Sequence, residues 1–228
     1  MRQDGQVLYG VLHRIVPPLL RAIWRPHVRG LEHVPRTGPL ILASNHRSFI
    51  DSVVIPAVTP RPVSFLAKSD YFTGRGVKGR LVKVWFTTFG ALPVDRDDSR
   101  AALASLDTAL GVLADGGAFG IYPEGTRSRD GRLYRGRTGV AQLALTSGAP
   151  IVPIGLMGTE RLQPVGSNRP RLVRVTVTFG EPIDVRGRYD GVPPGRARRE
   201  ITDRVMTEIQ RLTGQPEAGV YNDRAPDA

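Results

Sequence analysis

The sequence predicts a single α/β domain in which helices flank a mixed, mostly parallel sheet, with an amphipathic helical segment before it. Short apolar runs alternate with segments of helical periodicity, and no internal repeat or low-complexity linker divides the chain. With 228 residues, of which 40% are hydrophobic and 23% charged, the composition is that of an ordinary globular protein. We therefore expect an amphipathic segment at residues 1–36, the domain at 37–214 and a flexible tail at 215–228.

The apolar runs predict the strands of the sheet. In chain order these are residues 39–44, 63–67, 118–122, 151–156 and 172–179. The first four are short and apolar, which is typical of strands buried on both faces. The last alternates strictly between apolar and polar residues, so we expect it to have one solvated face. A further short extended run precedes Arg96.

Four segments between these runs are predicted to be helices: residues 49–58, 99–115, 140–147 and 196–212. Four leucines at helical spacing define one face of the second helix, namely Leu103, Leu106, Leu110 and Leu113. A glycine follows each of the last three helices and supplies a stop signal. The mixed basic and apolar segment at 77–86 stays unassigned.

Residues 7–24 carry apolar pairs at a spacing of four. Because four residues advance an α-helix by about 400° and the segment contains Pro17 and Pro18, we expect two short helices rather than one rod. Arginines flank the apolar face, an arrangement typical of a helix lying in a membrane surface. The same stripe also fits packing on the domain's own core. The membrane-facing candidates are Leu12, Ile15, Leu19, Ile23 and Trp24.

The charge balance calls for an anionic partner. Lys and Arg number 32 against 21 Asp and Glu, a net charge of +11, which suits nucleic acid, a membrane surface or a phosphorylated substrate. Nucleic acid is the weakest of these, because only 7% of the residues are aromatic and the arginines are scattered among acids. The absence of cysteine excludes disulfides, cysteine-ligated metal and a thiol nucleophile. We find no signal peptide and no apolar run of the roughly 18 residues that span a bilayer.

Polar clusters follow two of the apolar strands, where open α/β sheets bind ligands. In the first cluster His46 precedes Asp51 by five positions. Five positions on a helix differ by about 140°, so His46 must lie at or before the helix start to reach Asp51. A histidine oriented by a carboxylate suits a general base, although this spacing alone also fits an ordinary structural pair.

The second cluster, YPEGTRS at residues 122–128, contains Gly125 for close backbone approach and Arg127 for contact with phosphate oxygens. A further arginine, Arg96, ends the run GALPVDR. Two arginines and a His/Asp pair indicate a phosphorylated acceptor and a deprotonated hydroxyl. They do not identify the transferred group.

The segments NHRSFID, GALPVDR, YPEGTRS and APIVPIG, in that order, resemble the four sequence blocks of the glycerophospholipid acyltransferase superfamily, most closely the 1-acylglycerol-3-phosphate acyltransferases. The resemblance implies that His46 deprotonates the acceptor hydroxyl and that Asp51 orients it. It also implies a phosphate site and an acyl-donor side. The implied phosphate-binding residues are Arg96, Glu124, Gly125, Thr126 and Arg127, with Lys68 as a secondary candidate, and the donor side is Pro153 and Ile154.

The implied reaction moves a fatty acyl group from acyl-CoA or acyl carrier protein to lysophosphatidic acid and gives phosphatidic acid. Because a thioester is already activated, it requires no covalent enzyme intermediate, bound cofactor or metal. Backbone amides at the start of the helix after His46 are our candidate oxyanion donors. The resemblance also favours the membrane interpretation of residues 7–24, and hence a peripheral protein on the cytoplasmic face of the cell membrane.

Three alternatives remain. Acylation of glycerol 3-phosphate, or of another lysophospholipid, would use the same motifs. A hydrolase using His46 and Asp51 to activate water would leave the basic pocket and membrane segment poorly explained. A non-enzymatic, basic membrane- or nucleic-acid-binding module would explain the charge but not the ordered set of His46, Asp51, Glu124 and Arg127.

Overall fold

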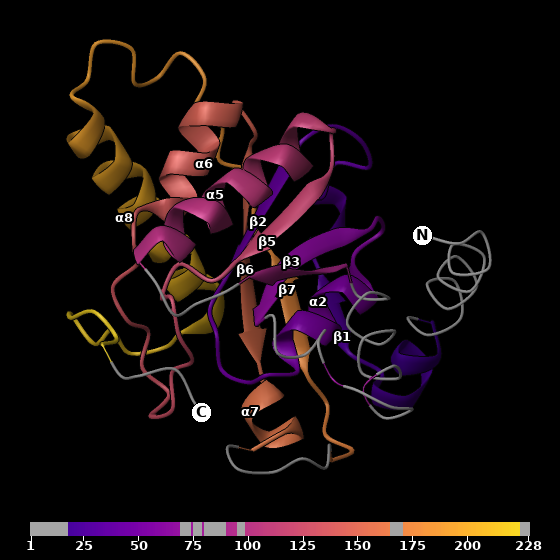
Figure 1. The fold of residues 1–228 in the computed structure, drawn as a ribbon. Helices are drawn as coiled ribbons and strands as arrows, with labels where there is room; N and C mark the ends of the chain where they lie inside the picture. Colours follow the sequence, from indigo (N-terminus) through magenta and orange to yellow (C-terminus); the bar gives the residue numbers. More distant parts are fainter. Residues whose placement is uncertain are drawn as a thin grey trace.

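The computed structural model describes residues 18–68, 74, 79, 90–94, 99–164 and 171–223. A seven-stranded sheet with the order β1-β7-β6-β2-β5-β3-β4 lies at its centre (Figure 1). All neighbouring strands are parallel except β6 and β7, which are antiparallel. The strands are β1 (His27–Arg29), β2 (Leu40–Ser44), β3 (Val63–Lys68), β4 (Ala91–Val94), β5 (Ala118–Ile121), β6 (Ile151–Met157) and β7 (Thr176–Phe179). The predicted α/β domain with a mixed, mostly parallel sheet is thus confirmed.

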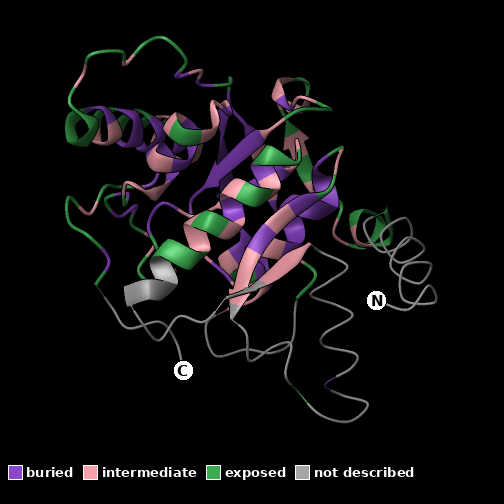
Figure 2. Ribbon diagram, turned by 45° about the horizontal axis from the view of Figure 1, so that its top comes forward, coloured by how far each residue is buried: buried purple, intermediate pink, exposed green. Residues whose placement is uncertain are grey.

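Helices cover both faces of this sheet. They are α2 (Asp51–Val58), α5 (Ser99–Ala114), α6 (Gly139–Ser147), α7 (Thr159–Leu162) and α8 (Pro194–Thr213), with a 3₁₀ turn at Leu31–His33. Alternate residues of β2 point to opposite faces: Leu40 and Leu42 pack with α2, whereas Ile41 and Ala43 pack with α5, α6 and α8. The central strands β2, β5 and β6 are buried between these layers, and the outer sides of the helices are exposed (Figure 2).

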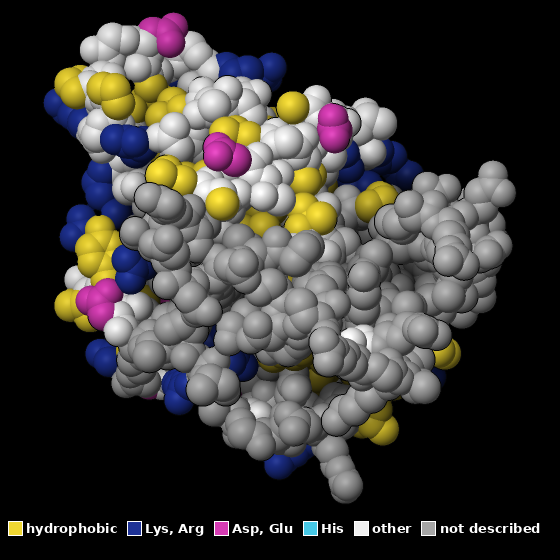
Figure 3. All heavy atoms as spheres, viewed as in Figure 1, with side chains coloured by type: hydrophobic (Ala, Val, Ile, Leu, Met, Phe, Trp, Pro, Cys, Tyr) yellow, Lys and Arg dark blue, Asp and Glu magenta, His cyan; other side chains and the backbone are white. Residues whose placement is uncertain are grey.

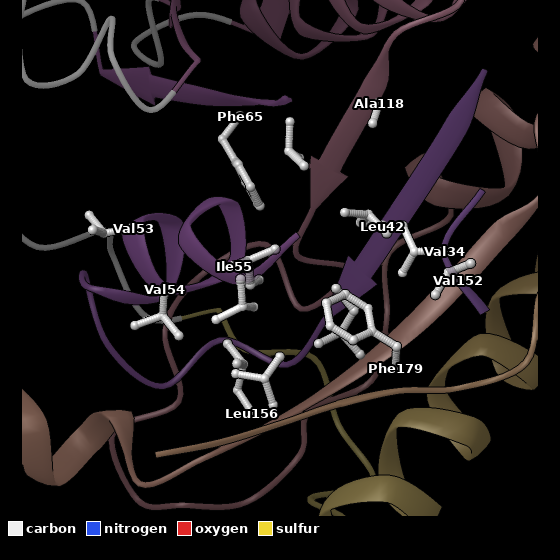
Figure 4. Close-up of a cluster of buried hydrophobic side chains, with 14 of the residues drawn as sticks. Val34, Leu42, Val53, Val54, Ile55, Phe65, Ala118, Val152, Leu156 and Phe179 are labelled. Atoms are coloured by element: carbon white, nitrogen blue, oxygen red, sulfur yellow. The ribbon is translucent and has the colours of Figure 1, made fainter. Parts of the chain in front are cut away.

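The core beneath α2 fixes the start of that helix at one edge of the sheet. Figure 4 shows Val54 and Ile55 of α2 among apolar side chains from the sheet, including Leu156 and Phe179. Ile55, Leu156 and Phe179 are at most 1% exposed. Because parallel β2 and β5 both end at this edge, the loops that follow them lie beside the start of α2.

Two predicted elements differ in detail. The last predicted strand is shorter, because β6 ends at Met157 and residues before Thr176 have no β6 partner to pair with. Leu103 is 66% exposed, so it does not belong to the buried face that includes Leu113. The predicted helices at 49–58, 99–115, 140–147 and 196–212 are present with ends shifted by at most two residues. Apart from residue 79, the segment 77–86 lies outside the described residues.

The N-terminal boundary of the domain lies earlier than residue 37. Strand β1 pairs with β7 in parallel, so residues 27–29 belong to the sheet. Residues 18–24 are helical and dock on α2, where Arg21 donates to the carbonyls of Ala57 and Thr59. The sequence predicts instead that residues 1–36 form a separate amphipathic segment. A strand of three residues such as β1 has too little hydrophobic periodicity to be recognised in a sequence. The predicted domain boundary at residue 37 was therefore wrong.

The helix at residues 18–24 has a core-facing side and an exposed side. Leu20 and Trp24 pack against the core beneath α2, whereas Leu19 is 54% and Ile23 49% exposed. Trp24 therefore packs against the domain. The prediction from the sequence was that it faces a membrane. The other two membrane candidates, Leu12 and Ile15, lie outside the described residues. None of the helices described here is long and apolar enough to span a membrane.

Residues 215–223, here called the C-terminal segment, are not the frayed tail that we expected. The Leu133 amide donates to the Pro216 carbonyl at 2.9 Å, and the Ala218 amide donates to the Leu133 carbonyl at 2.8 Å. Gln215 is 4% and Asn222 3% exposed. The C-terminal segment is polar, contains glycine and has no hydrophobic periodicity, so its sequence is typical of a flexible tail. In the structure its backbone forms hydrogen bonds with the loop around Leu133.

Part of the positive charge lies on the surface in ion pairs. On α8, Arg196 pairs with Glu200, Arg199 with Asp203 and Arg211 with Glu208. Figure 3 shows basic side chains spread around the described part of one face, with acidic side chains among them. Exposed pairs of this kind contribute little to stability. The total charge is therefore a weaker guide to function than the arginines near the ends of the central strands.

Candidate active site

His46 lies in the loop between β2 and α2, at the carboxyl end of the central strand. Its Nδ1 is 2.9 Å from Oδ2 of Asp51, the first residue of α2. Asp51 is fully buried, whereas the His46 side chain is 16% exposed. His46 thus precedes the helix, as the spacing required, and the structure brings the two predicted residues into contact.

Oδ2 of Asp51 accepts two further hydrogen bonds. The backbone amides of Arg47 and Ser48 donate to it at 2.7 and 2.8 Å. Because this oxygen acts as an acceptor, Nδ1 of His46 carries the proton and Nε2 keeps its lone pair. These two amides are engaged by Asp51 and precede the helix, so the expected oxyanion donors, backbone amides at the start of that helix, stay a prediction.

Tyr122 covers one face of the His46 ring. The ring centroids lie 3.9 Å apart and the planes differ by 9°, and the Tyr122 hydroxyl is 2.8 Å from Oγ of Ser52. Burial, and secondarily the charge of Asp51, raise the pKa of the Tyr122 hydroxyl well above its usual value. Tyr122 is therefore a neutral stacking partner for the imidazole. The YPEGTRS segment contains Tyr122, but nothing in the sequence indicates its stacking on His46 or its contact with Ser52.

Glu124 has a different position from the one that we expected. It is fully buried, and its two carboxylate oxygens accept the amides of His46 and Tyr134, each at 2.9 Å. Burial raises the pKa of Glu124 to about 7, against the lowering effect of the two amides. A carboxylate that is enclosed in this way is not available to a substrate phosphate. Glu124 instead holds the loop that carries His46.

The turn after β5 holds the other backbone group of His46. The Ser128 amide donates to the His46 carbonyl at 2.8 Å, and the Ser128 hydroxyl donates to the Arg132 carbonyl at 2.6 Å. Gly125 has φ = 81°, a left-handed conformation that favours glycine. The YPEGTRS segment thus fixes both the amide and the carbonyl of His46.

Asn45 anchors the same loop from the opposite side. Its amide group exchanges hydrogen bonds with the backbone of Leu156 at 2.8 and 2.9 Å. Its Nδ2 also donates to Oε1 of Gln215 at 2.7 Å. Both side chains are buried. Sequence reasoning did not find Gln215, which lies 170 positions from Asn45 and within no motif.

The predicted phosphate-binding residues are only partly described. Thr126 and Arg127 are half-buried on the turn after β5, where Nδ2 of Asn222 donates to the Arg127 carbonyl at 3.2 Å. Lys68 is the last residue of β3, at the edge where β2 and β5 also end. Arg96 lies outside the described residues. Of the predicted phosphate-binding residues, Thr126 and Arg127 thus lie on the turn after β5, which binds the His46 backbone.

Pro153 and Ile154 lie inside β6 and are buried. Ile154 packs in the core beneath α2, and the Pro153 carbonyl accepts the Gly180 amide at 2.8 Å. These two residues support the sheet from within. Over the described ranges, no group of three or more His, Asp or Glu side chains is placed to hold a metal ion.

The arrangement provides a partly exposed imidazole oriented by a buried carboxylate, beside a loop that carries an arginine; among the described residues, Nε2 has no hydrogen-bond partner. It can remove a proton from a hydroxyl group that approaches His46. Arg127, whose guanidinium could form charge-assisted hydrogen bonds to a phosphate, is half-buried on the neighbouring turn.

Comparison with known proteins identifies the family of the chain. The acyltransferase family model matches residues 25–157. The 1-acyl-sn-glycerol-3-phosphate acyltransferase of Bacillus subtilis is 27% identical over 183 residues, covering 79% of this chain and 84% of that protein. The chloroplast enzyme of that name from Arabidopsis thaliana is 31% identical over 145 residues, covering 63% of this chain and 39% of its own length. This chain thus spans about two fifths of the chloroplast relative.

The fold of this chain is also similar to that of a protein of known structure. The 1-acyl-sn-glycerophosphate acyltransferase of Thermotoga maritima superposes with a TM-score of 0.67 over 93% of this chain and 83% of that chain. The two sequences are 22% identical, so this likeness concerns the fold.

Proposed function

Since the chain belongs to the acyltransferase family, we propose that it transfers a fatty acyl group from an acyl thioester to the free hydroxyl of lysophosphatidic acid, giving phosphatidic acid. The observation that carries this proposal is the contact between Nδ1 of His46 and the buried Asp51, which leaves Nε2 as a base. The names of the relatives from Bacillus subtilis and Arabidopsis thaliana support lysophosphatidic acid as the acceptor.

In the proposed reaction Nε2 of His46 takes the proton of the acceptor hydroxyl as its oxygen attacks the thioester carbonyl. The C–S bond breaks, and the proton passes to the leaving thiolate. General base catalysis accounts for about 10²- to 10⁴-fold of the rate enhancement. The remainder comes from the positions of the two substrates and from stabilisation of the oxyanion. Asp51 keeps the imidazole in the productive tautomer throughout.

For the acceptor phosphate we propose Arg127, assisted by Thr126 and the backbone at Gly125, with Arg96 and Lys68 as further contacts. Arg127 is half-buried on the turn whose Ser128 amide donates to the His46 carbonyl, and this common turn supports Arg127 as a phosphate contact. Glu124 is proposed as a positioning residue rather than a phosphate ligand.

For access to lipid substrates we propose that the helix at 18–24 rests on the membrane surface through Leu19 and Ile23, continued by Leu12 and Ile15. Its opposite side is already packed on the domain. Such a helix would hold the protein on the cytoplasmic face of the membrane as a peripheral protein. The acyl donor in this proposal is acyl-CoA or acyl carrier protein.

The deciding experiment assays the purified protein in mixed micelles. Both donor types are crossed with lysophosphatidic acid, glycerol 3-phosphate and a lysophospholipid without a terminal phosphate, and His46→Ala serves as the blank. We expect turnover with lysophosphatidic acid and none with the His46→Ala variant, while its circular dichroism spectrum and vesicle binding are unchanged. Undiminished turnover by this variant would overturn the mechanism, and preference for another acceptor would overturn the substrate.

The phosphate assignment has its own test. We expect Arg127→Ala to lower kcat/KM for lysophosphatidic acid by about tenfold to hundredfold, as for the loss of a charge-assisted hydrogen bond, with little effect on the KM of the donor. The exposed Arg188 provides a matched control, and Arg188→Ala should leave both values unchanged. Equal losses for donor and acceptor would contradict the assignment.

A further inference from the structure

Gln215 lies directly after α8 and its stop residue Gly214, in the C-terminal segment. Its side chain is buried, with 4% of the residue exposed. Oε1 of Gln215 accepts from Nδ2 of Asn45 at 2.7 Å, and Nε2 donates to the Gly131 carbonyl at 2.8 Å. The Gln215 side chain thus forms hydrogen bonds to two different parts of the chain, one through its oxygen and one through its nitrogen.

Those two parts are the loops that hold His46. Asn45 belongs to the loop of residues 45–50, which contains His46. Gly131 belongs to the stretch of residues 122–134, from which Glu124 and Ser128 bind the His46 backbone. Gln215 therefore connects the loop that carries the base with the loop that clamps it.

We propose that Gln215 is a positioning residue of this active site, which sets the position of His46 relative to the 122–134 loop by bridging Asn45 and Gly131. The inference rests on the proposed acyl transfer and extends the active site to a segment outside the four sequence blocks. Gln215 contacts no group that we assign to substrate, so it acts through the two loops.

Loss of this bridge has a defined structural effect. Without Gln215, Nδ2 of Asn45 keeps the Leu156 carbonyl as its acceptor. The Asn45 anchor on β6 therefore survives, and the connection between the two loops is what disappears. A small displacement of a base from its substrate lowers kcat steeply, because proton transfer requires close and aligned atoms. Substrate binding does not depend on that alignment to the same extent.

The test variant is Gln215→Met, which keeps the length and approximate volume of the side chain but removes both hydrogen bonds. Gln215→Asn is a second variant, which keeps an amide group that is one methylene too short for both partners. The matched control is Gln210→Met. Gln210 is half-buried on α8, and its Nε2 donates at 3.4 Å to the Gln215 backbone carbonyl, away from Asn45.

We expect Gln215→Met and Gln215→Asn to lower kcat by about tenfold or more, with the KM of both substrates changed by less than about threefold. Gln210→Met should keep both values. Each variant is measured at matched concentrations of folded protein, determined by thermal denaturation. The proposal is overturned if both Gln215 variants keep kcat within about twofold of the unaltered protein, or if the KM values rise while kcat stays the same.

A second readout needs no substrate, and so separates failure of this inference from failure of the proposed function. In protein labelled with ¹⁵N-histidine, the Nδ1 proton of His46 is assigned as the resonance that His46→Ala removes. We expect this proton to exchange with solvent about tenfold faster in Gln215→Met than in Gln210→Met, because the His46–Asp51 contact opens more often. Equal exchange rates in the two variants would overturn the inference whatever the enzyme assay gives.

Discussion

Oε1 of Glu124 accepts the backbone amide of His46 at 2.9 Å, so this acidic residue holds the base by its main chain rather than by its ring. The other oxygen of the carboxylate accepts the Tyr134 amide. An acid in a loop proposed to bind phosphate would repel the ligand if it were exposed. Enclosed between two amides, Glu124 instead joins the residues around Tyr134 to the loop of His46.

We predict that Glu124→Gln lowers kcat by about tenfold or more while the KM of the acceptor changes little. The glutamine side chain offers one acceptor and one NH₂ group, so either the His46 or the Tyr134 amide would face a donor. The loss of a hydrogen bond to a charged group corresponds to about 1.5–3 kcal/mol. Steady-state kinetics in mixed micelles measures the effect.

The exposed Glu181 serves as the control for this substitution, and Glu181→Gln should leave kcat unchanged. If Glu124→Gln instead raises the KM of the acceptor at constant kcat, Glu124 contacts the substrate and the positioning role is wrong.

The stability of the protein should depend on pH through Glu124. Burial raises the pKa of this carboxyl from 4.5 to about 7, so the native state binds the proton more tightly than the unfolded chain. The contribution of Glu124 to stability is therefore fully present below pH 4.5 and is lost as the pH rises through 7. A difference of this size corresponds to about 3 kcal/mol.

Urea denaturation of the unaltered protein and of Glu124→Gln, at several pH values from 4.5 to 8, isolates this contribution. We expect the free energy of unfolding of the unaltered protein, relative to the variant, to decrease over this range by an amount on the order of 3 kcal/mol. A difference that stays constant with pH would show that Glu124 titrates alike in the folded and unfolded states.

The sequence was sufficient to single out His46 and Asp51, because both lie within six consecutive residues of a block that resembles the acyltransferase family; their spacing alone would also have fitted an ordinary structural pair. The role of Glu124 could not be found in the same way. Its partners are backbone amides, one of them 78 positions away, and backbone groups leave no mark in a sequence. Gln215 was missed, and Trp24 was predicted to face a membrane rather than the core, for a related reason. Each makes a tertiary contact with a partner that is distant in the chain.

Tyr122 should act through its ring rather than through its hydroxyl. Its ring lies 3.9 Å from the His46 ring, so it limits rotation of the imidazole. We predict that Tyr122→Phe keeps kcat within about threefold, because the stacked ring remains, whereas Tyr122→Leu lowers kcat by about tenfold or more. Measurements of kcat against pH for the two variants provide the comparison. Equal losses in Tyr122→Phe and Tyr122→Leu would assign the effect to the hydroxyl and its hydrogen bond with Ser52.

The exposed side of the helix at 18–24 should bind membranes. Leu19 and Ile23 are 54% and 49% exposed, so the double substitution Leu19→Ser with Ile23→Ser removes apolar surface without disturbing the core-facing Leu20 and Trp24. We predict that sedimentation with phosphatidylglycerol vesicles weakens by about tenfold or more, from the apolar area lost. Leu103→Ser is the matched control, because Leu103 is 66% exposed on α5 and should not affect binding. Equal sedimentation of the double variant and this control would contradict a membrane role for the helix.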